Sequence, residues 1–270
     1  MKLKEVLAKK LTKKELALLP TSFDTVGDII IFNEFPLELE KKEKLIGQTL
    51  LQERKNIQVV AKKVKQYAGK YRLPKLKIIA GKKRKQTIHT ESGIKLKLHI
   101  EKCYFSSRTS HERLRLSSIV QPPEEILVMF SGIGVIPILL AKKAKSVVGI
   151  EFNPIAHQYA LENLILNKIK NVQLLQGDVN DIMPTLKNKF DRIIMPLPKE
   201  ANLYLNLALT KLKPQGTIHL YAFLEENNME EQAYKLIKES IKDFKITNLV
   251  KCGAYAPGVY RVCIEFKTKI

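Results

Sequence analysis

A strand, a glycine-rich turn, a helix and a second strand are expected in succession between residues 126 and 154, and this segment constrains the fold more than any other. An apolar run ends at Phe130, glycines follow at Gly132 and Gly134, and a second apolar run ends in Glu151. Two strands joined through a helix predict a parallel sheet. Glycine lets a ligand approach the backbone, and a carboxylate after the second strand can accept hydrogen bonds from ribose hydroxyls. The segment therefore predicts a site for a cofactor that contains adenosine.

The turn lacks the third glycine of the dinucleotide-binding pattern, because Pro137 stands in its place. A cofactor without phosphates fits such a turn better, and S-adenosylmethionine is the obvious candidate. The alternative is a tight strand-to-helix turn without a ligand, since two glycines alone are a weak signal. The carboxylate of Glu151, followed by Asn153 and Pro154, favours the cofactor site. The segment is thus typical of a methyltransferase.

From residue 124 onward strands and helices alternate, which predicts a Rossmann-like class I methyltransferase domain, α/β with a doubly wound, mostly parallel sheet. Its strands are expected over residues 126–130, 146–150, 172–175, 190–195 and 217–223, its helices over 114–120, 155–167, 201–212 and 230–241, a turn over 214–216, and two strands at the end. A smaller α+β domain is expected before it, with helices over 4–18 and 37–52 and strands over 25–32, 57–61, 75–80, 87–89 and 94–100. We predict two domains, residues 1–95 and 96–270, with the boundary between residues 90 and 120.

The chain is strongly basic, with 47 Lys and Arg against 27 Asp and Glu and a formal net charge of +20. A polyanion is the economical partner, because lysines near phosphates release condensed counterions. The alternative is a general preference for lysine on solvated surfaces. Positive charge is crowded in the first part of the chain, at Lys62, Lys63, Lys65, Lys70, Lys75, Lys77 and residues 82–85. This crowding favours a front half that faces RNA.

Several other classes of protein are disfavoured by the sequence. Apolar runs are interrupted well short of a membrane span, and no signal-peptide pattern opens the chain. The three cysteines are widely spaced, and neither they nor the five histidines show metal-ligand spacing. We therefore expect a cytoplasmic, monomeric protein with free thiols, no bound metal and no membrane partner.

Two further candidate positions follow expected strands. Asp178 comes just after the third strand and could accept a hydrogen bond from an adenine amino group. The alternative is a loop cap, because aspartate favours turns. Pro196 and Pro198 follow the fourth strand. They hold the backbone extended and leave the carbonyl of Pro196 available to accept a hydrogen bond from a substrate amine.

The segment from Tyr104 to Arg113 combines two aromatic residues, two arginines and one glutamate directly before the cofactor domain. Aromatic and arginine side chains can stack on an extruded base and contact its phosphates. The alternative is an interdomain hinge with surface ion pairs.

These motifs together resemble the archaeal and eukaryotic tRNA (guanine-N1)-methyltransferase family, which methylates guanosine at position 37. The residues that carry the resemblance are 104–106 and 112–113, 129–134, 153–154, 191–198, and in the flanking regions 22–28, 71–72, 79–81 and 255–257. The resemblance implies tRNA as the partner of a basic front domain and S-adenosylmethionine as the cofactor. The small N-terminal domain of the family is expected to be missing.

The resemblance also implies roles for individual residues. Glu112 matches the general base for the guanine N1 proton, and Arg72 matches an arginine that stabilises the base and its O6 oxygen. A carboxylate at N1 and a cation at O6 make chemical sense, because N1 becomes nucleophilic only as its proton leaves. The matching cofactor positions are Tyr104, Phe130, Gly132, Gly134, Glu151 and Asp178. The positions expected to contact the substrate are Arg108, Arg113, Pro196 and Pro198.

Two departures from the family pattern leave alternatives open. Val128 stands where many relatives have an acid, and Pro196 stands where many have asparagine. A wybutosine-pathway transferase, which moves the aminocarboxypropyl group of the same cofactor, is favoured by the short N-terminus. Methylation is favoured by residues 151–154 and by the Pro-Leu-Pro segment. A non-catalytic RNA-binding protein is compatible with the two departures but not with an intact Glu112 and Arg72.

Overall fold

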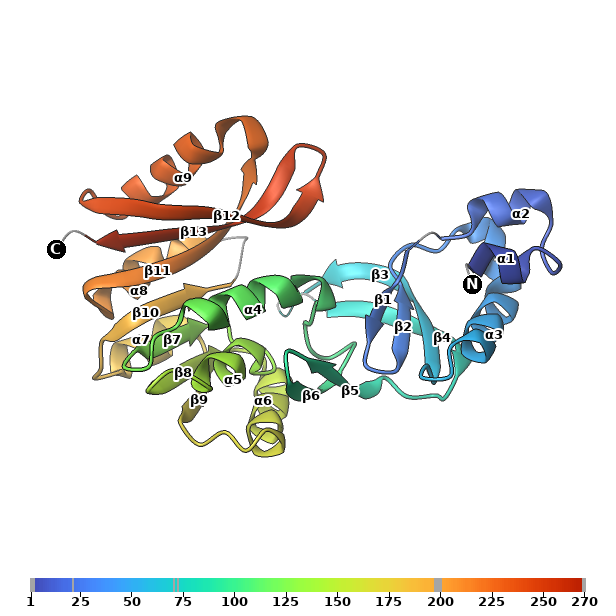
Figure 1. Ribbon diagram of the computed structural model, residues 1–270, viewed down its shortest axis with the longest axis horizontal. Coiled ribbons are helices and arrows are strands. Elements are labelled where there is room, and N and C mark those ends of the chain that lie inside the picture. The colour runs from blue at the N-terminus through green and yellow to red at the C-terminus, as the bar shows by residue number, and fades with distance from the viewer. Residues whose placement is uncertain (1–2, 21, 70, 72, 197–200, 269–270) are drawn as a thin grey trace. The chain divides into compact units, whose positions relative to one another are not determined.

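The chain is divided into two units, Met1–Ser107 and Arg108–Ile270, in a computed structural model that describes residues 3–268 except 21, 70, 72 and 197–200 (Figure 1). Each unit has its own core of buried aliphatic side chains. The boundary proposed from the sequence, after residue 95, would cut strand β6 (Ile94–His99) near its start. Residues 96–107 belong to the first unit, and the division after Ser107 lies within the range of residues 90–120 expected from the sequence.

A four-stranded sheet with the order β1-β2-β3-β4 forms the first unit. Its strands are β1 (Asp24–Val26), β2 (Ile29–Phe32), β3 (Val59–Ala68) and β4 (Leu73–Gly81), and only the β2–β3 pair is parallel. Its helices are α1 (Leu3–Leu7), α2 (Lys13–Leu18), the 3-10 helix η1 (Leu37–Lys42) and α3 (Glu43–Glu53). The core lies between these helices and the sheet, around Phe32, Leu39 and Ile46. Gly47 allows α3 to lie close to β4, since a Cβ there would approach Ala80 to 2.7 Å.

The hairpin of β5 (Gln86–Glu91) and β6 is attached to the turn between β1 and β2. The Asp28 carboxylate accepts hydrogen bonds from the Thr87 hydroxyl (2.7 Å) and from Arg84. The Gly27 N–H donates to Nδ1 of His89 (3.1 Å). Gly27 has a φ of +57°, and a Cβ there would approach the Thr87 hydroxyl to 2.2 Å. Glycine is therefore required at this turn.

Three expectations for the first unit are wrong. The single helix over residues 4–18 is interrupted, because Thr12 begins α2 with a capping box. Its side chain accepts from the Glu15 N–H, and the Glu15 carboxylate accepts from the Thr12 N–H (2.8 Å). The strand over residues 25–32 is a hairpin, since the chain reverses at Gly27. Residues 37–52 form η1 and α3 rather than one helix.

The second unit is a seven-stranded sheet with the order β12-β13-β11-β10-β7-β8-β9. Its strands are β7 (Glu125–Met129), β8 (Ser146–Glu151), β9 (Val172–Gln176), β10 (Phe190–Met195), β11 (Leu212–Glu225), β12 (Phe244–Ala256) and β13 (Val259–Thr268). The five strands from β9 to β11 are parallel, and β13 runs antiparallel between β11 and β12. The α/β class with a mostly parallel sheet is confirmed.

Helices cover both faces of this sheet (Figure 1). The helices are η2 (Ser107–Thr109), α4 (Ser110–Ile119), α5 (Val135–Ala141), α6 (Pro154–Leu166), α7 (Val179–Thr185), η3 (Ala201–Tyr204), α8 (Leu205–Thr210), η4 (Glu226–Asn228) and α9 (Met229–Lys238). Residues of α4 and α5 pack with Val128 and Ile194 on one face. Residues of α7, α8 and α9 pack with Leu127 and Met129 on the other. The central strands are buried on both sides, which explains their unbroken apolar runs.

Three expectations for the second unit are corrected by the structure. Helix α4 begins at Ser110 rather than at residue 114, so that Glu112 and Arg113 lie in its first turn. Helix α7 was not expected, and Asp178 caps it. Residues 214–216 belong to the long strand β11, where the β10 register shifts between Phe190 and Arg192, rather than to a separate turn.

Within the described parts of the chain, no helix has the length and apolar character needed to span a membrane. Cys103 and Cys263 are buried, Cys252 is partly buried, and none of the three forms a disulfide.

Candidate active site

The glycine turn after β7 lies at the carboxyl edge of the parallel sheet. Phe130, Gly132 and Gly134 all have positive φ, at +57°, +58° and +83°. A Cβ at Gly134 would lie 3.1 Å from Ala160 of α6, so this glycine serves close helix packing. A Cβ at Gly132 would meet nothing within 4 Å. Open space therefore lies in front of Gly132, where a ligand can approach the backbone.

Glu151 ends β8, the strand beside β7, and its carboxylate is fixed by the backbone. One oxygen, Oε2, accepts from the Gly132 N–H (2.7 Å), and Oε1 accepts from the Asn153 N–H (2.7 Å). Burial raises the pKa of Glu151, against the opposing effect of the N–H groups of Asn153, Gly132 and Phe152. A carboxylate has about four acceptor positions, so Glu151 can still accept hydrogen bonds from a ligand.

The residues around this turn fit an adenosine-containing cofactor. The open space over Gly132 borders a carboxylate that can accept from ribose hydroxyls. Phe130 packs edge-to-face against Tyr204 at 5.2 Å between ring centroids. Tyr204 was not singled out from the sequence, because the end of a short 3-10 helix carries no pattern that indicates its position.

Asp178 lies just after β9 on the same edge. Its carboxylate accepts from the backbone N–H (2.9 Å) and the side-chain amide (3.0 Å) of Asn180 at the start of α7. The capping role considered as the alternative is therefore present. A contact of Asp178 with adenine stays a prediction.

Glu112 is buried on α4, with an exposed fraction of 7%, and accepts three hydrogen bonds. Arg115 grips it with two: Nε donates to Oε2 (2.7 Å) and Nη2 to Oε1 (2.8 Å). The Tyr221 hydroxyl of β11 donates to Oε1 as well. The Glu112 carboxylate raises the pKa of Arg115, and burial raises the pKa of Tyr221 well above its usual value. Glu112 is thus a fixed acceptor.

Pro196 and Glu112 lie at the same level of the sheet. Met195, the last residue of β10, pairs with Leu220, so Pro196 stands beside Tyr221, which bonds Glu112. Arg261 of β13 donates through Nη2 to the Pro196 carbonyl (3.4 Å). This carbonyl is therefore already engaged by one donor, and only its second lone pair is available to a substrate amine.

Five further residues were predicted to belong to the site. Arg113 is buried on α4 and donates to the Thr109 hydroxyl, and Arg108 lies in η2. Tyr104 belongs to the first unit, and 51% of its side chain is exposed. Arg72 and Pro198 lie outside the described residues. The roles proposed for all of them stay predictions.

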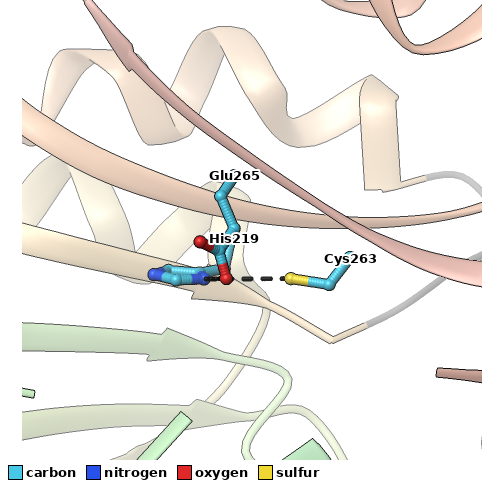
Figure 2. A group of neighbouring side chains, drawn as sticks. All are labelled: His219, Cys263 and Glu265. Atoms are coloured by element: carbon cyan, nitrogen blue, oxygen red, sulfur yellow. Dashed lines mark hydrogen bonds and ion pairs between the residues drawn. The ribbon is translucent and has the colours of Figure 1, made fainter. Parts of the chain in front are cut away.

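A chain of buried charges continues from Glu112 to β13 and β11. Arg115 also donates to Glu265 of β13. Nδ1 of His219 lies 3.4 Å from the same carboxylate (Figure 2). On the other side of the ring, Nε2 of His219 contacts Arg192, which grips Glu124 (2.7 and 2.8 Å). Arginine can only donate, so Nε2 is the acceptor and the proton of the neutral ring is assigned to Nδ1, facing Glu265.

His219, Cys263 and Glu265 have ligand atoms within 4.8 Å of one another, a spacing that a metal ion could use. Arginines occupy this cluster instead, because Arg115 pairs with Glu265 and Arg192 with His219. Burial raises the pKa of the Cys263 thiol well above its usual value. A cation would have to displace two guanidinium groups, so the cluster is best described as an ion-pair network that fastens α4 to β11 and β13.

The strand order and the glycine turn define the class of protein as a methyltransferase of the Rossmann-like type. Residues 87–249 match the TRM5/TYW2 methyltransferase domain, and residues 3–84 match the TYW2 N-terminal domain. The chain belongs to the TRM5/TYW2 family, and S-adenosylmethionine is its cofactor. The expectation that a small N-terminal domain is missing is not supported, because an N-terminal domain of the TYW2 type is present.

Relatives in this family carry out different reactions at position 37 of tRNA: methylation of guanosine, methylation of 4-demethylwyosine, and aminocarboxypropyl transfer. The chain is 40% identical over 253 residues to the tRNA (guanine(37)-N(1))-methyltransferase Trm5b of Pyrococcus abyssi, covering 92% of this chain and 75% of the relative. It is 32% identical over 259 residues to the tRNA(Phe) (4-demethylwyosine(37)-C(7)) aminocarboxypropyltransferase of Methanocaldococcus jannaschii, covering 91% and 97%.

Solved structures of relatives show the same fold, one in complex with tRNA and one in complex with the cofactor. A complex of aTrm5 with tRNALeu has a TM-score of 0.86 and 30% identity, covering 99% of this chain and 78% of that one. The TYW2 of Methanocaldococcus jannaschii in complex with AdoMet has a TM-score of 0.69 and 28% identity, covering 92% and 100%.

Proposed function

We propose that this protein methylates N1 of the guanosine at position 37 of tRNA. The observation that carries the proposal is the alignment of two sites along one sheet edge. The cofactor turn at Gly132 follows β7, and Pro196 and Tyr221 lie at the same end of the neighbouring β10 and β11. The identity of 40% to a guanosine-37 N1-methyltransferase supports the choice of reaction.

In the proposed mechanism the cofactor, when bound, supplies an electrophilic methyl group. Glu112 takes the N1 proton, which leaves the lone pair of N1 free to attack. Three donated hydrogen bonds keep Glu112 in place and leave about one of its acceptor positions open. Glu151 would hold the ribose of the cofactor. The glycine turn brings the backbone close to the cofactor, so that the methyl group can be held near N1.

Aminocarboxypropyl transfer is the second candidate. It is supported by the match of residues 3–84 to the TYW2 N-terminal domain and by the coverage of 97% of a relative with that activity. The two reactions use the same cofactor but break different bonds to its sulfur. An adenosine cradle at Gly132 and Glu151 serves either reaction, so the geometry at the base decides between them.

One assay separates the candidates. The protein is incubated with an unmodified tRNA transcript and cofactor labelled either in the methyl group or in the aminocarboxypropyl carbons, and the RNA is digested to nucleosides. A second transcript carries 4-demethylwyosine at the target position. Methyl label in 1-methylguanosine supports the proposal. Aminocarboxypropyl label on the tricyclic base supports the alternative, and no transfer to either RNA contradicts both.

A transcript with adenosine in place of the target guanosine is the matched control. It keeps the same phosphates and fold but lacks the N1 proton and the O6 oxygen. Label on this control would show that transfer does not depend on the target base, and would contradict the proposed site.

A further inference from the structure

Next to the Glu112 site, a row of side chains on β11 and β13 extends toward the carboxyl end of β11. In the register of β11 and β13, His219 pairs with Glu265, Tyr221 with Cys263, and Phe223 with Arg261. Side chains two residues apart on a strand share one face. Phe223 and Arg261 therefore lie on the same face as Tyr221, one row closer to the carboxyl end of β11.

Arg261 is the cation of this row, and its hydrogen-bonding capacity is poorly used. Its guanidinium lies 4.9 Å from the centroid of the Tyr221 ring, and Nη2 donates to the Pro196 carbonyl at a long 3.4 Å. Its Nε is buried and has no hydrogen-bond partner among the residues that the structure describes. Buried donors are normally paired, since an unpaired one loses its hydration without compensation. A ligand that places a hydrogen-bond acceptor near Arg261 would supply the missing partner.

An aromatic pair lies beside this cation. Phe223 stacks on Tyr255 of β12, with 3.9 Å between ring centroids and 30° between the rings. Tyr255 keeps 55% of its side chain exposed. Phe223 and Arg261 are cross-strand partners, so the aromatic surface and the guanidinium border one location. Exposed aromatic rings next to an arginine are typical of sites that hold an unstacked nucleobase.

We propose that Arg261, Phe223 and Tyr255 form the part of the base pocket that recognises the target purine, with Arg261 donating to its O6 oxygen and the aromatic pair packing against the ring. This rests on the proposed function. O6 has two lone pairs, so a bond from Arg261 leaves one for Arg72, to which the family resemblance assigns the same oxygen. Glu112 and Arg261 both contact Tyr221, one at its hydroxyl and one at its ring. N1 and O6 are neighbours on a guanine, so a carboxylate and an arginine on either side of one tyrosine match that edge.

The recognition follows from hydrogen-bond chemistry. Guanine presents the O6 acceptor to Arg261, whereas adenine presents an amino group, and arginine has only donors. Two donors facing each other repel, so Arg261 should reject adenosine. The aromatic pair offers no such distinction, because every base has a π-face. Removing the side chain of Arg261 should therefore change the relative affinity for guanosine and adenosine RNA, whereas removing that of Tyr255 should not.

The test measures RNA affinity in the presence of S-adenosylhomocysteine, with transcripts carrying guanosine or adenosine at the target position. Wild-type protein should bind the guanosine RNA more tightly. Arg261→Ala should weaken that binding about 10- to 100-fold and leave the affinity for adenosine RNA equal or higher, and Arg261→Lys should restore part of the loss. Tyr255→Ala should weaken both RNAs equally. Lys251→Ala is the control, because Lys251 lies on the same hairpin but pairs with Glu226.

Two results would overturn the proposal. One is equal affinity of the wild-type protein for both RNAs. The other is an equal loss for both RNAs in Arg261→Ala, with the salt slope reduced by about one, which would place Arg261 on a phosphate. No group is transferred in this binding measurement, so failure of the proposed methylation would appear in the labelling assay and not here. Cofactor affinity and thermal stability of each variant confirm that it is folded.

Discussion

The carboxylate of Glu112 illustrates how one residue is prepared for proton transfer. A buried carboxylate without partners would be costly, and Arg115 and Tyr221 supply donors to both of its oxygens. The same arginine continues to Glu265, so the position of Glu112 depends on a strand far away in the sequence. A carboxylate fixed in this way can meet the edge of a base without first reorganising.

We predict that Glu112→Gln lowers the single-turnover rate at neutral pH by about 100-fold or more, because an amide cannot take the N1 proton. Cofactor affinity should stay within about twofold of wild type, since Glu151 and Gly132 are untouched. The rate is measured by quenched-flow with labelled cofactor. Glu226→Gln removes an exposed carboxylate and serves as the control.

The pH profile separates proton transfer from mere support of α4. Above neutral pH, guanine increasingly loses its N1 proton to solvent, so the rate of Glu112→Gln should rise toward that of wild type. A variant that was only misassembled would show no such recovery. A constant ratio of the two rates across pH would contradict the general-base role.

At the scale of elements, the apolar strands were predictable and the polar connections between them were not. The runs that became β7, β8 and β10 are buried on both faces, so they stand out in the sequence. The first turn of α4 does not, because Glu112 and Arg113 are buried by ion pairs and hydrogen bonds rather than by apolar contacts. Hydrophobic periodicity therefore places the start of this helix four residues too late.

The residues of the candidate site also divide into those that could be predicted from the sequence and those that could not. The glycine turn and Glu151 are local motifs and could be found from the sequence. Tyr221, Arg261 and Arg115 could not, since strand register and helix docking bring them together across long sequence separations. No short pattern surrounds them. Sequence reasoning thus indicates the cofactor half of the site well and the base half only in part.

The docking of α4 on β11 and β13 should depend on pH. Burial by itself would raise the pKa of Glu265, but hydrogen bonds from His219 and Arg115 lower it to about 2, from an ordinary 4.5. Burial also lowers the pKa of His219, so the ring is neutral in the folded protein. Both groups bind protons more readily in the unfolded chain. The free energy of unfolding is therefore expected to decrease as the pH is lowered.

We predict a first loss below pH 6.5, as His219 gains a proton on unfolding, and a second between about pH 4.5 and 2, as Glu265 does. The second step is worth about 3 kcal/mol. Urea unfolding followed by circular dichroism across pH measures it. Glu265→Gln should be less stable at neutral pH and lack the second step. A second step of unchanged size in that variant would show that other carboxylates cause it.

At the scale of the whole molecule, a net charge of +20 predicts that RNA binding depends strongly on salt. The basic turn at residues 82–85 shows that not every cation contributes to this dependence. Arg84 pairs with Asp28 and Lys85 with Glu101, within the first unit. Lys82 and Lys83 are exposed. Lys82 and Lys83 are thus available to phosphates, while Arg84 and Lys85 hold the first unit together.

We predict that Lys82→Gln and Lys83→Gln each reduce the slope of log Kd against log salt for tRNA by up to about one, because each removes at most one phosphate contact. Arg84→Gln should leave the slope nearly unchanged and instead lower the unfolding temperature, since it breaks the link between Asp28 and the β5–β6 hairpin. Filter binding between 50 and 300 mM salt, about the range in which counterion release is linear, measures the slope. An unchanged slope in both lysine variants would mean that tRNA does not contact this turn, and a large change in Arg84→Gln would mean that ion pairing does not withhold a cation from RNA.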